Sequence, residues 1–216
     1  MSVVVEECRV RLTPGDDVQA ALSGGGVVCF SAGVYPGAFT LGANVTLRGE
    51  PGAVLDASGK GSVLQISDDD LQIRVEGMTL RNGHNEAGGG LFLHGWSDVI
   101  VDRCVVEGAR ASQAGGAVYV SAGRLTVTGS EFRDNAGRFG QDLIATGASE
   151  VTIAGSRFAS DVAAREGAVV RVTDSTVSGT LDVRGTTTRG PTVTIAGGSV
   201  PRVRNDANVP GTVIQQ

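Results

Sequence analysis

The chain of 216 residues carries a formal net charge of −5, and its 33 glycines stand beside an aromatic content of only 4%. The acidic balance argues against a nucleic-acid partner, which requires a basic face, and no apolar run approaches the roughly 18 residues of a membrane-spanning helix. The apolar share of 41% is sufficient for a core of Val, Ile, Leu and Ala, and this composition favours short strands joined by tight turns.

The N-terminal residues MSVVVEECRV lack the basic segment and the long apolar run of a secretory signal peptide. We therefore expect a cytoplasmic chain, one exported by a signal-less route, or a domain of a longer protein. Cys8, Cys29 and Cys104 are odd in number, with no CxxC spacing and no neighbouring His, which argues against a metal or redox site. We interpret all three as buried, small apolar side chains.

Residues 13–22, TPGDDVQAAL, predict a short helix. An Asp is a favoured N-cap, and Val18, Ala21 and Leu22 fall on one face at helical spacing. Three glycines from Gly24 onward end the pattern.

From residue 73 the sequence repeats every 26 residues, and apolar residues alternate with period two inside each repeat, so the elements are strands. In the repeat that starts at residue 124 the pattern predicts three strands, over 125–128, 131–133 and 142–146. The recurring apolar positions are Ile73, Val99, Leu125 and Val151; Val75, Val101, Val127 and Ile153; Leu80, Val106, Phe132 and Phe158; and Phe92, Val118, Ile144 and Val170.

The spacing changes outside these four repeats but the pattern continues. VTLRG at 45–49 matches IRVEG at 73–77, and the later segments VTDSTV at 172–177 and IAGGSV at 195–200 match the same strand. Short repeats that cannot bury their inner faces alone stack into a solenoid. We therefore predict a single-stranded, all-β parallel β-helix of about seven coils with three short strands per coil, each strand lying about 4.8 Å from its equivalent.

This interpretation divides the chain into three parts of one domain. Residues 1–26 supply an N-terminal strand and a capping helix, 27–200 form the parallel β-helix, and 201–216 form a C-terminal tail or cover. RGTTTRGPT at 184–192 and the tail look irregular. Because open sheet edges need covering, the C-terminal edge is a possible contact for another chain, and a homo-oligomer would follow.

Two sets of aligned residues mark the bends. Gly77, Arg103, Gly129 and Gly155 recur between the first and second strands, where a sharp bend requires a permissive backbone. After the second strand the aligned residues are Gly83, Ala109, Asn135 and Asp161, and Gly, Asn and Asp suit a left-handed conformation.

Several segments resemble a known group of proteins. PGDDVQAAL, GGVVCFSAGVYPG and NVTLRGE look like the entry to the right-handed parallel β-helix proteins of the pectin/pectate lyase-like superfamily. GGAV at 115–118 and FRDN at 132–135 are similar to the GGA[ILV] and FxxN motifs that recur in polymorphic outer membrane proteins. The resemblance implies a right-handed parallel β-helix. It implies no single activity, because such motifs encode turns and stacking.

Outward positions mostly alternate in charge along the predicted stack, as in Asp98, Arg124 and Glu150, or in Arg81, Glu107 and Arg133, which is typical of solvated ion-pair ladders.

One column differs. Glu76 stacks on Asp102 with no positive charge between them, and Arg74 lies on the same face. Arg74, Glu76 and Asp102 are therefore candidate catalytic residues, because paired carboxylates beside an arginine can perform acid/base chemistry. Glu76 and Asp102 are also candidate ligands of Ca²⁺, which lyases of the resembled superfamily bind through acidic side chains. No cofactor is expected otherwise. The alternative is one more ion-pair ladder, which includes Arg48.

Three residues are candidate binding residues. His84 and Glu86 lie in NGHNEAGGG at 82–90, which we interpret as a Gly-rich loop before the third strand. Trp96, the only tryptophan, falls at a turn, where an indole can stack on a sugar, anchor a partner or cover a corner of the coil. His94 is expected at an inward or strand-end position.

Three functional hypotheses follow. The first is a non-catalytic structural or interaction module that binds a protein or a polysaccharide. The second is a carbohydrate-active enzyme, either a polysaccharide lyase or a hydrolase. The third is a scaffold that assembles end to end through its C-terminal edge.

Overall fold

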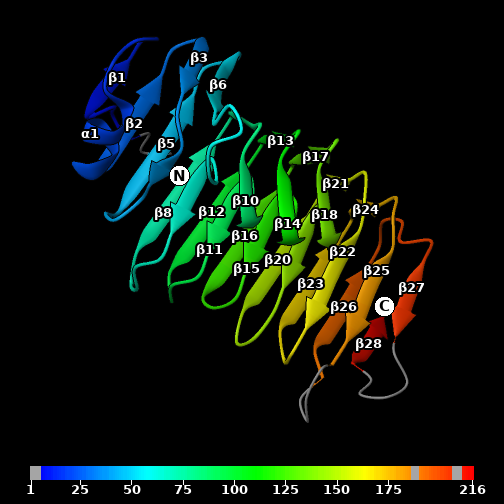
Figure 1. Ribbon diagram of the computed structural model, residues 1–216. Coiled ribbons are helices and arrows are strands. Elements are labelled where there is room, and N and C mark those ends of the chain that lie inside the picture. Colours follow the sequence, from blue (N-terminus) through cyan, green and yellow to red (C-terminus); the bar gives the residue numbers. More distant parts are fainter. Residues whose placement is uncertain (1–5, 186–189, 206–210) are drawn as a thin grey trace.

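The computed structural model describes residues 6–185, 190–205 and 211–216. Within these ranges the chain is all-β apart from one six-residue helix, and its strands stack into an elongated solenoid (Figure 1). The described strands form four sheets, and all strand pairs within them are parallel. The predicted all-β architecture of stacked parallel strands is confirmed.

The four sheets follow the long axis of the solenoid. Sheet A consists, in order, of β1 (Val10–Leu12), β2 (Gly26–Phe30), β5 (Val45–Gly49), β8 (Gln72–Glu76), β12 (Asp98–Asp102), β16 (Arg124–Thr128), β20 (Glu150–Ala154), β23 (Val169–Thr173), β26 (Thr192–Ala196) and β28 (Thr212–Gln215). Sheet B consists of β3 (Gly33–Pro36), β6 (Ala53–Asp56), β9 (Thr79–Arg81), β13 (Val105–Glu107), β17 (Glu131–Arg133), β21 (Arg157–Phe158) and β24 (Thr176–Val177). Sheet C consists of β4 (Phe39–Thr40), β7 (Leu64–Ile66), β11 (Leu91–Leu93), β15 (Val118–Val120), β19 (Leu143–Ala145), β22 (Val162–Arg165), β25 (Leu181–Arg184) and β27 (Val203–Asn205).

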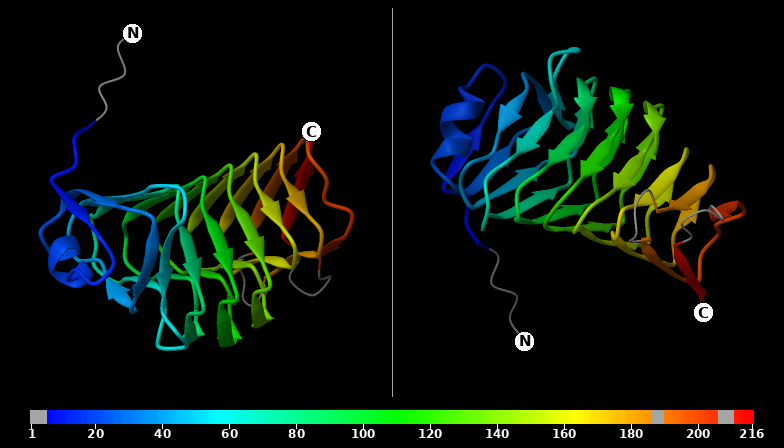
Figure 2. Two further views of the ribbon diagram at one scale, coloured as in Figure 1. Left: turned by 90° about the horizontal axis from the view of Figure 1, so that it is seen from above. Right: turned by 60° about the horizontal axis from the view of Figure 1, so that its bottom comes forward.

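Sheet D has three strands, β10 (His84–Ala87), β14 (Arg110–Ala114) and β18 (Ala136–Phe139). They lie side by side and project from one long side of the solenoid (Figure 2). Three strands were predicted for the repeat that starts at residue 124, but β18 is a fourth strand between β17 and β19. The interpretation of 82–90 as a loop was also wrong, because His84 and Glu86 belong to β10.

The register of sheet A follows the repeat. Ile73 pairs with Val99, Val99 with Leu125, and Leu125 with Val151, and all four side chains are buried. In sheet B, Phe132 pairs with Phe158, and their rings stack with centroids 4.4 Å apart. Stacking of like residues thus makes one continuous apolar core along the axis.

In sheet C the predicted alignment is out of step by one residue. Val118 pairs with Leu91 and with Leu143, so the predicted partners Phe92 and Ile144 point outward instead of inward. Val170 belongs to sheet A, where it pairs with Val151. The turns that precede sheet C differ in length between repeats, so a constant spacing places the outer and inner faces incorrectly.

The bend predicted between the first and second strands of each repeat is present, and its residues have positive φ. Gly77, Gly129 and Gly155 have φ of 68°, 52° and 56°, and Arg103 at the same bend has φ 51° although it carries a side chain. At the second bend the left-handed residue is Asp134, with φ 56°, and not the predicted Asn135. Asn135 is buried instead, and its side chain accepts a hydrogen bond from the Ala109 N–H and donates to the Val106 carbonyl oxygen.

The helix α1 (Val18–Ser23) begins after Asp17, whose carboxylate accepts a hydrogen bond from the Ala20 N–H at 3.0 Å. Val18 and Leu22 are buried in the core, as predicted from their helical spacing. At the other end, β27 and β28 extend sheets C and A beyond Val200, so the tail is not wholly irregular. Parts of the two segments predicted to be irregular, 186–189 and 206–210, lie outside the described residues.

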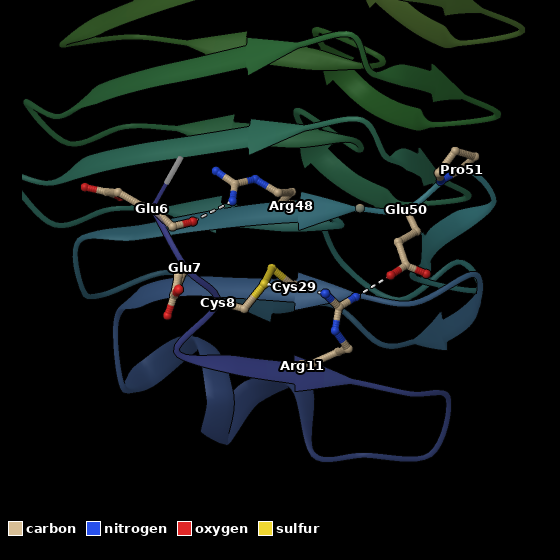
Figure 3. A pocket seen from close by; sticks show the side chains of 9 residues that line it. Glu6, Glu7, Cys8, Arg11, Cys29, Arg48, Glu50 and Pro51 are labelled. Atoms are coloured by element: carbon tan, nitrogen blue, oxygen red, sulfur yellow. Dashed lines mark hydrogen bonds and ion pairs between the residues drawn. A yellow bond between two sulfur atoms is a disulfide. The ribbon is translucent and has the colours of Figure 1, made fainter. Parts of the chain in front are cut away.

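The cysteines were interpreted as buried, small apolar side chains; Cys29 and Cys104 are buried, but the disulfide that joins Cys29 to the half-buried Cys8 was not predicted. Cys8 and Cys29 form a disulfide across the outer face of sheet A (Figure 3). Cys29 alternates with the inward Val28 and Phe30, so its sulfur faces the N-terminal segment that returns over β2. Cys104 is buried and free, and burial raises the pKa of its thiol to about 11.

The disulfide is expected to stabilise the N-terminal end of the solenoid. It closes a loop with a sequence separation of 21 residues that contains β1 and α1. Replacing both cysteines (Cys8→Ser with Cys29→Ser) should therefore lower the free energy of unfolding by about 2–4 kcal/mol. Urea unfolding followed by circular dichroism measures this change. Dithiothreitol should reproduce it in the unaltered chain and have no further effect on the double variant; an unaltered chain that reductant does not destabilise contradicts the assignment.

Candidate functional site

Two hollows lie along the outer face of sheet C, with strands of sheet D as their wall. The hollows, of about 510 Å³ and 490 Å³, adjoin here, because Tyr119 lines both of them. We call them together the sheet C groove. Its floor residues come from consecutive strands of sheet C, namely Gln65, Phe92, Tyr119 and Ile144. These residues face outward because their strand neighbours, such as Leu91 and Leu93, point into the core.

The centre of the floor is an aromatic platform. The rings of Phe92 and Tyr119 stack with centroids 5.5 Å apart and an interplanar angle of 8°. The His94 ring lies 5.9 Å from Phe92 at an angle of 20°, which extends the platform toward the end of β11. His94 is exposed at the end of the strand, and its Nδ1 lies 2.7 Å from Ser121 Oγ.

The wall of the groove is polar. Asn85 and Glu86 come from β10 and Gln113 from β14, and all three line the first hollow. Asn85 Nδ2 donates to Ser62 Oγ at 2.9 Å, and Gln113 Nε2 lies 3.5 Å from Glu86 Oε2. The wall therefore offers amide and carboxylate groups opposite an aromatic floor.

The C-terminal end of the groove is lined by arginines around one acid. Arg165 donates to Asp182 Oδ2 at 2.7 Å, and Arg184 Nε donates to Asp182 Oδ1 at 2.8 Å. Burial alone would raise the pKa of Asp182, but the hydrogen bonds from the two arginines outweigh it and lower the pKa. This carboxylate is therefore held in its ionised form as part of the fold.

The predicted catalytic residues lie elsewhere, on the outer face of sheet A. Arg74 donates to Glu76 Oε2 and to Asp102 Oδ2, each at 2.9 Å. Arg48 binds Glu76 at 2.5 Å, and Arg103 binds Asp102 at 2.8 Å. The two carboxylates thus share three arginines, in an extended form of the ion-pair ladder considered for Arg48, Glu76 and Asp102.

This network does not favour a bound cation. Three guanidinium groups already neutralise the two carboxylates, and a divalent ion would have to displace them. Among the described residues, no group of three or more His, Cys, Asp or Glu side chains gathers in a way that could hold a metal ion. In the described part of the chain, no helix is both long and apolar enough to span a membrane.

The predicted binding residues lie in two places. Glu86 lines the sheet C groove, and His84 is an exposed residue at the start of the same strand, β10. Trp96 lies outside the groove, on the turn between β11 and β12, with 59% of its surface exposed. The structure does not bring Trp96 together with His84 and Glu86 in one site.

The predicted ladders of alternating charge are present on the outer faces, but one arginine pairs with a different acid from the one predicted. Arg124 Nε lies 2.7 Å from Asp98, and Arg133 lies 2.7 Å from Glu107, as the alternating columns predicted. Arg81 instead lies 2.7 Å from Asp56 in the preceding strand of sheet B. These pairs are consistent with a mainly structural role for most outward charges.

A further hollow of about 760 Å³ lies beside the disulfide (Figure 3). Its two guanidinium groups are engaged by neighbours, because Arg11 forms an ion pair with Glu50, and Arg48 binds both Glu76 and the Glu6 carbonyl oxygen. We interpret this hollow as part of the attachment of the N-terminal segment.

The aromatic platform was missed at the sequence level. Tyr119 was not considered, and Phe92 was assigned to the core because the constant spacing placed it beside Val118. The alternation LFL in β11 and VYV in β15, with one aromatic between two aliphatic residues, is the signal that could have located both rings.

Ionisation of Glu76 should contribute to stability in neutral solution. Burial raises the pKa of Glu76, but hydrogen bonds from Arg48 and Arg74 outweigh it, and the net pKa is lowered. A group with a lowered pKa in the folded state contributes stability above its unfolded pKa and loses it as the pH falls through the folded pKa. Glu76→Gln should therefore destabilise the protein at pH 7 and lose less stability than the unaltered chain from about pH 5 to pH 3.

Urea unfolding at a series of pH values measures this difference. Glu131→Gln is the matched control, since the Glu131 side chain is 43% exposed whereas that of Glu76 is 10% exposed. The control should keep the pH dependence of the unaltered chain. Equal pH dependence in the Glu76→Gln variant and the unaltered chain would show that the network does not hold Glu76 ionised.

The chain matches no protein-family model, no curated protein and no solved structure.

Proposed function

We propose that the protein is a non-catalytic glycan-binding module and that a polysaccharide lies along the sheet C groove. The observation that carries this proposal is the stacked pair of Phe92 and Tyr119 on the groove floor. The C–H faces of a sugar ring are apolar and flat enough to cover an aromatic ring. Two parallel, stacked rings on neighbouring strands form an apolar ridge that consecutive parts of one chain can contact.

The polar wall supplies the hydrogen-bonding groups that a sugar also requires. Hydroxyl groups both donate and accept hydrogen bonds, so a sugar site needs partners of both kinds. Asn85 and Gln113 carry amides that donate and accept, and Glu86 accepts. A protein ligand would fit less well, because stable protein interfaces require a broad, well-packed apolar centre.

A binding role is favoured over glycoside hydrolysis. Glycoside hydrolysis requires two carboxyl groups on either side of one bond. The carboxylates of the groove, Glu86 and Glu166, line different hollows, and Asp182 is paired with arginines. Glu76 and Asp102 belong to sheet A and share three arginines. The enzyme therefore remains the alternative hypothesis.

We further infer that the solenoid is a right-handed parallel β-helix of about seven coils whose N-terminal end is capped by α1. The likeness of PGDDVQAAL and GGVVCFSAGVYPG to the pectin/pectate lyase-like superfamily supports this handedness. The burial of Val18 and Leu22 supports the capping role of the helix. In this architecture the two hollows follow the solenoid axis along sheet C, which suits an extended polymer.

The proposal is tested by removing the platform. A glycan array identifies the class of polysaccharide, and calorimetry with its best-bound oligosaccharide then measures affinity. Tyr119→Ala should weaken binding by about tenfold or more, since a central aromatic contact is lost. Tyr119→Phe keeps the platform and should bind nearly as well.

Trp96→Ala is the matched control, because this aromatic residue lies outside the groove. Circular dichroism and thermal unfolding confirm that each variant is folded. Retention of full affinity by folded Tyr119→Ala would refute the groove as the binding site. Release of new reducing ends or unsaturated products from the bound polysaccharide would instead support the enzymatic alternative.

A second candidate function is self-association through the C-terminal edge. β28 is the last described strand of sheet A, and its Ile214 is 42% exposed, while Val203 in β27 is 36% exposed. An edge strand with exposed apolar side chains is a template for pairing with another chain.

Light scattering over a range of concentrations tests this second candidate. We expect a dimer or a higher assembly at high concentration, and Ile214→Lys should shift it toward the monomer, because a charge on an edge strand opposes pairing. Thr126→Lys on β16, an outward residue in the middle of sheet A, is the control. A monomer at every concentration contradicts this candidate.

A further inference from the structure

Trp96 is an exposed aromatic residue on a firmly held turn. Its backbone N–H donates to Asp69 Oδ1 at 2.7 Å, and its backbone carbonyl oxygen accepts from the Asp70 N–H at 3.0 Å. The next residue, Ser97, donates its hydroxyl to the Asp68 carbonyl oxygen and accepts from the Leu71 N–H. The turn is thus bonded to the turn of the preceding repeat, yet the indole remains 59% exposed.

The indole borders a hollow of about 250 Å³ that is separate from the sheet C groove. Small residues from the next two turns, Gly123 and Ala148, line the same hollow and leave room beside the ring. The hollow lies where the strands of sheet C turn into those of sheet A.

The hollow is rich in acceptors. Asp70, Asp98 and Glu150 line it with three carboxylates, against the single cation Arg124. Both side-chain oxygens of Asp98 are bound by Arg124, at 2.7 and 2.9 Å, and this hydrogen bonding lowers the pKa of Asp98. Two carboxylates, those of Asp70 and Glu150, are left in excess over the positive charge.

The chemistry of this lining selects a type of ligand. Among the described residues that line the hollow, the side-chain donors are the indole N–H and the guanidinium of Arg124, which Asp98 already engages. A neutral sugar needs donors as well as acceptors, so it is poorly matched. Guanidinium and ammonium groups carry donors only, and Trp is the best aromatic partner for a cation.

We propose that Trp96, Asp70 and Glu150 form a binding site for an arginine or lysine side chain on a basic peptide segment of a partner protein. One cation stacks on the indole and hydrogen-bonds to the Asp70 carboxylate, and Glu150, three strands along sheet A, pairs with a second basic residue of the segment. This site is independent of the glycan groove and would give the module a second, protein-directed contact. It also explains why a firmly held turn keeps its large apolar side chain in solvent.

Tryptophan fluorescence reports on this site alone, because Trp96 is the only tryptophan of the chain. The experiment titrates the full chain with the peptide acetyl-Arg-Gly-Arg-amide and follows tryptophan emission at near-physiological salt. The expected result is a saturable change in emission. Calorimetry with the same peptide gives affinities for variants that lack the indole.

Two variants test the two parts of the site. Asp70→Asn with Glu150→Gln should weaken binding of the peptide about 2- to 30-fold, through the loss of two charge pairs. Trp96→Leu should weaken it about two- to fivefold, through the loss of the cation–π contact. Both substitutions are on the surface, and thermal unfolding verifies that the variants are folded.

The matched control is Glu6→Gln with Glu7→Gln, which removes the same charge far along the chain from the turn. It should change the affinity by less than about twofold, since a remote exposed charge is screened. Tyr119→Ala, the groove variant, should bind the peptide unchanged, so failure of this proposal is distinguishable from failure of the glycan proposal.

Two outcomes would overturn the proposal. The first is equal weakening in the Asp70/Glu150 and Glu6/Glu7 double variants, which would mean that the peptide responds only to net charge. The second is a change in Trp96 emission on addition of a neutral oligosaccharide such as maltohexaose but not of the arginine peptide, which would make the site a sugar site.

Discussion

In-register stacking of parallel strands is the constraint on which the rest of the structure depends. Each strand lies on its equivalent in the neighbouring repeat, so a residue has nearly the same side chain above and below it wherever the repeat is regular. Inward columns then become continuous apolar rods, as with the stacked rings of Phe132 and Phe158. Outward columns stack in the same way, so several carboxylates have an arginine in the next strand, as Asp98 has Arg124 and Glu107 has Arg133.

The same constraint explains how much of the fold could be predicted from the sequence. From β8 to β20 in sheet A and from β9 to β21 in sheet B the repeats keep a constant length, so the columns that contain Leu125 and Phe132 were located correctly. The bend at Gly77, Arg103, Gly129 and Gly155 was located for the same reason. In sheet C the preceding segments vary in length, and the alignment of Phe92 and Val118 was off by one residue, which exchanges the inner and outer faces.

The features that could not be predicted depend on contacts outside the repeat. The bond between Cys8 and Cys29 forms because the N-terminal segment returns over sheet A, and no periodicity encodes that return. β10, β14 and β18 are polar and lack an inward apolar column, so their sequences look like loops. Trp96 was correctly placed at a turn, but its carboxylate neighbours come from three different repeats and could not be grouped from spacing alone.

Sheet D also has a consequence for how this protein could change in evolution. Its strands are insertions between sheets B and C, and each described one comes from a separate repeat. The length of the groove wall is therefore set by how many repeats carry the insertion, independently of the core columns that hold the solenoid together. Duplication or loss of one such repeat would lengthen or shorten the wall by one strand spacing, about 4.8 Å, while the stacking of the core is preserved. The repeat thus serves as a unit of length for the groove itself.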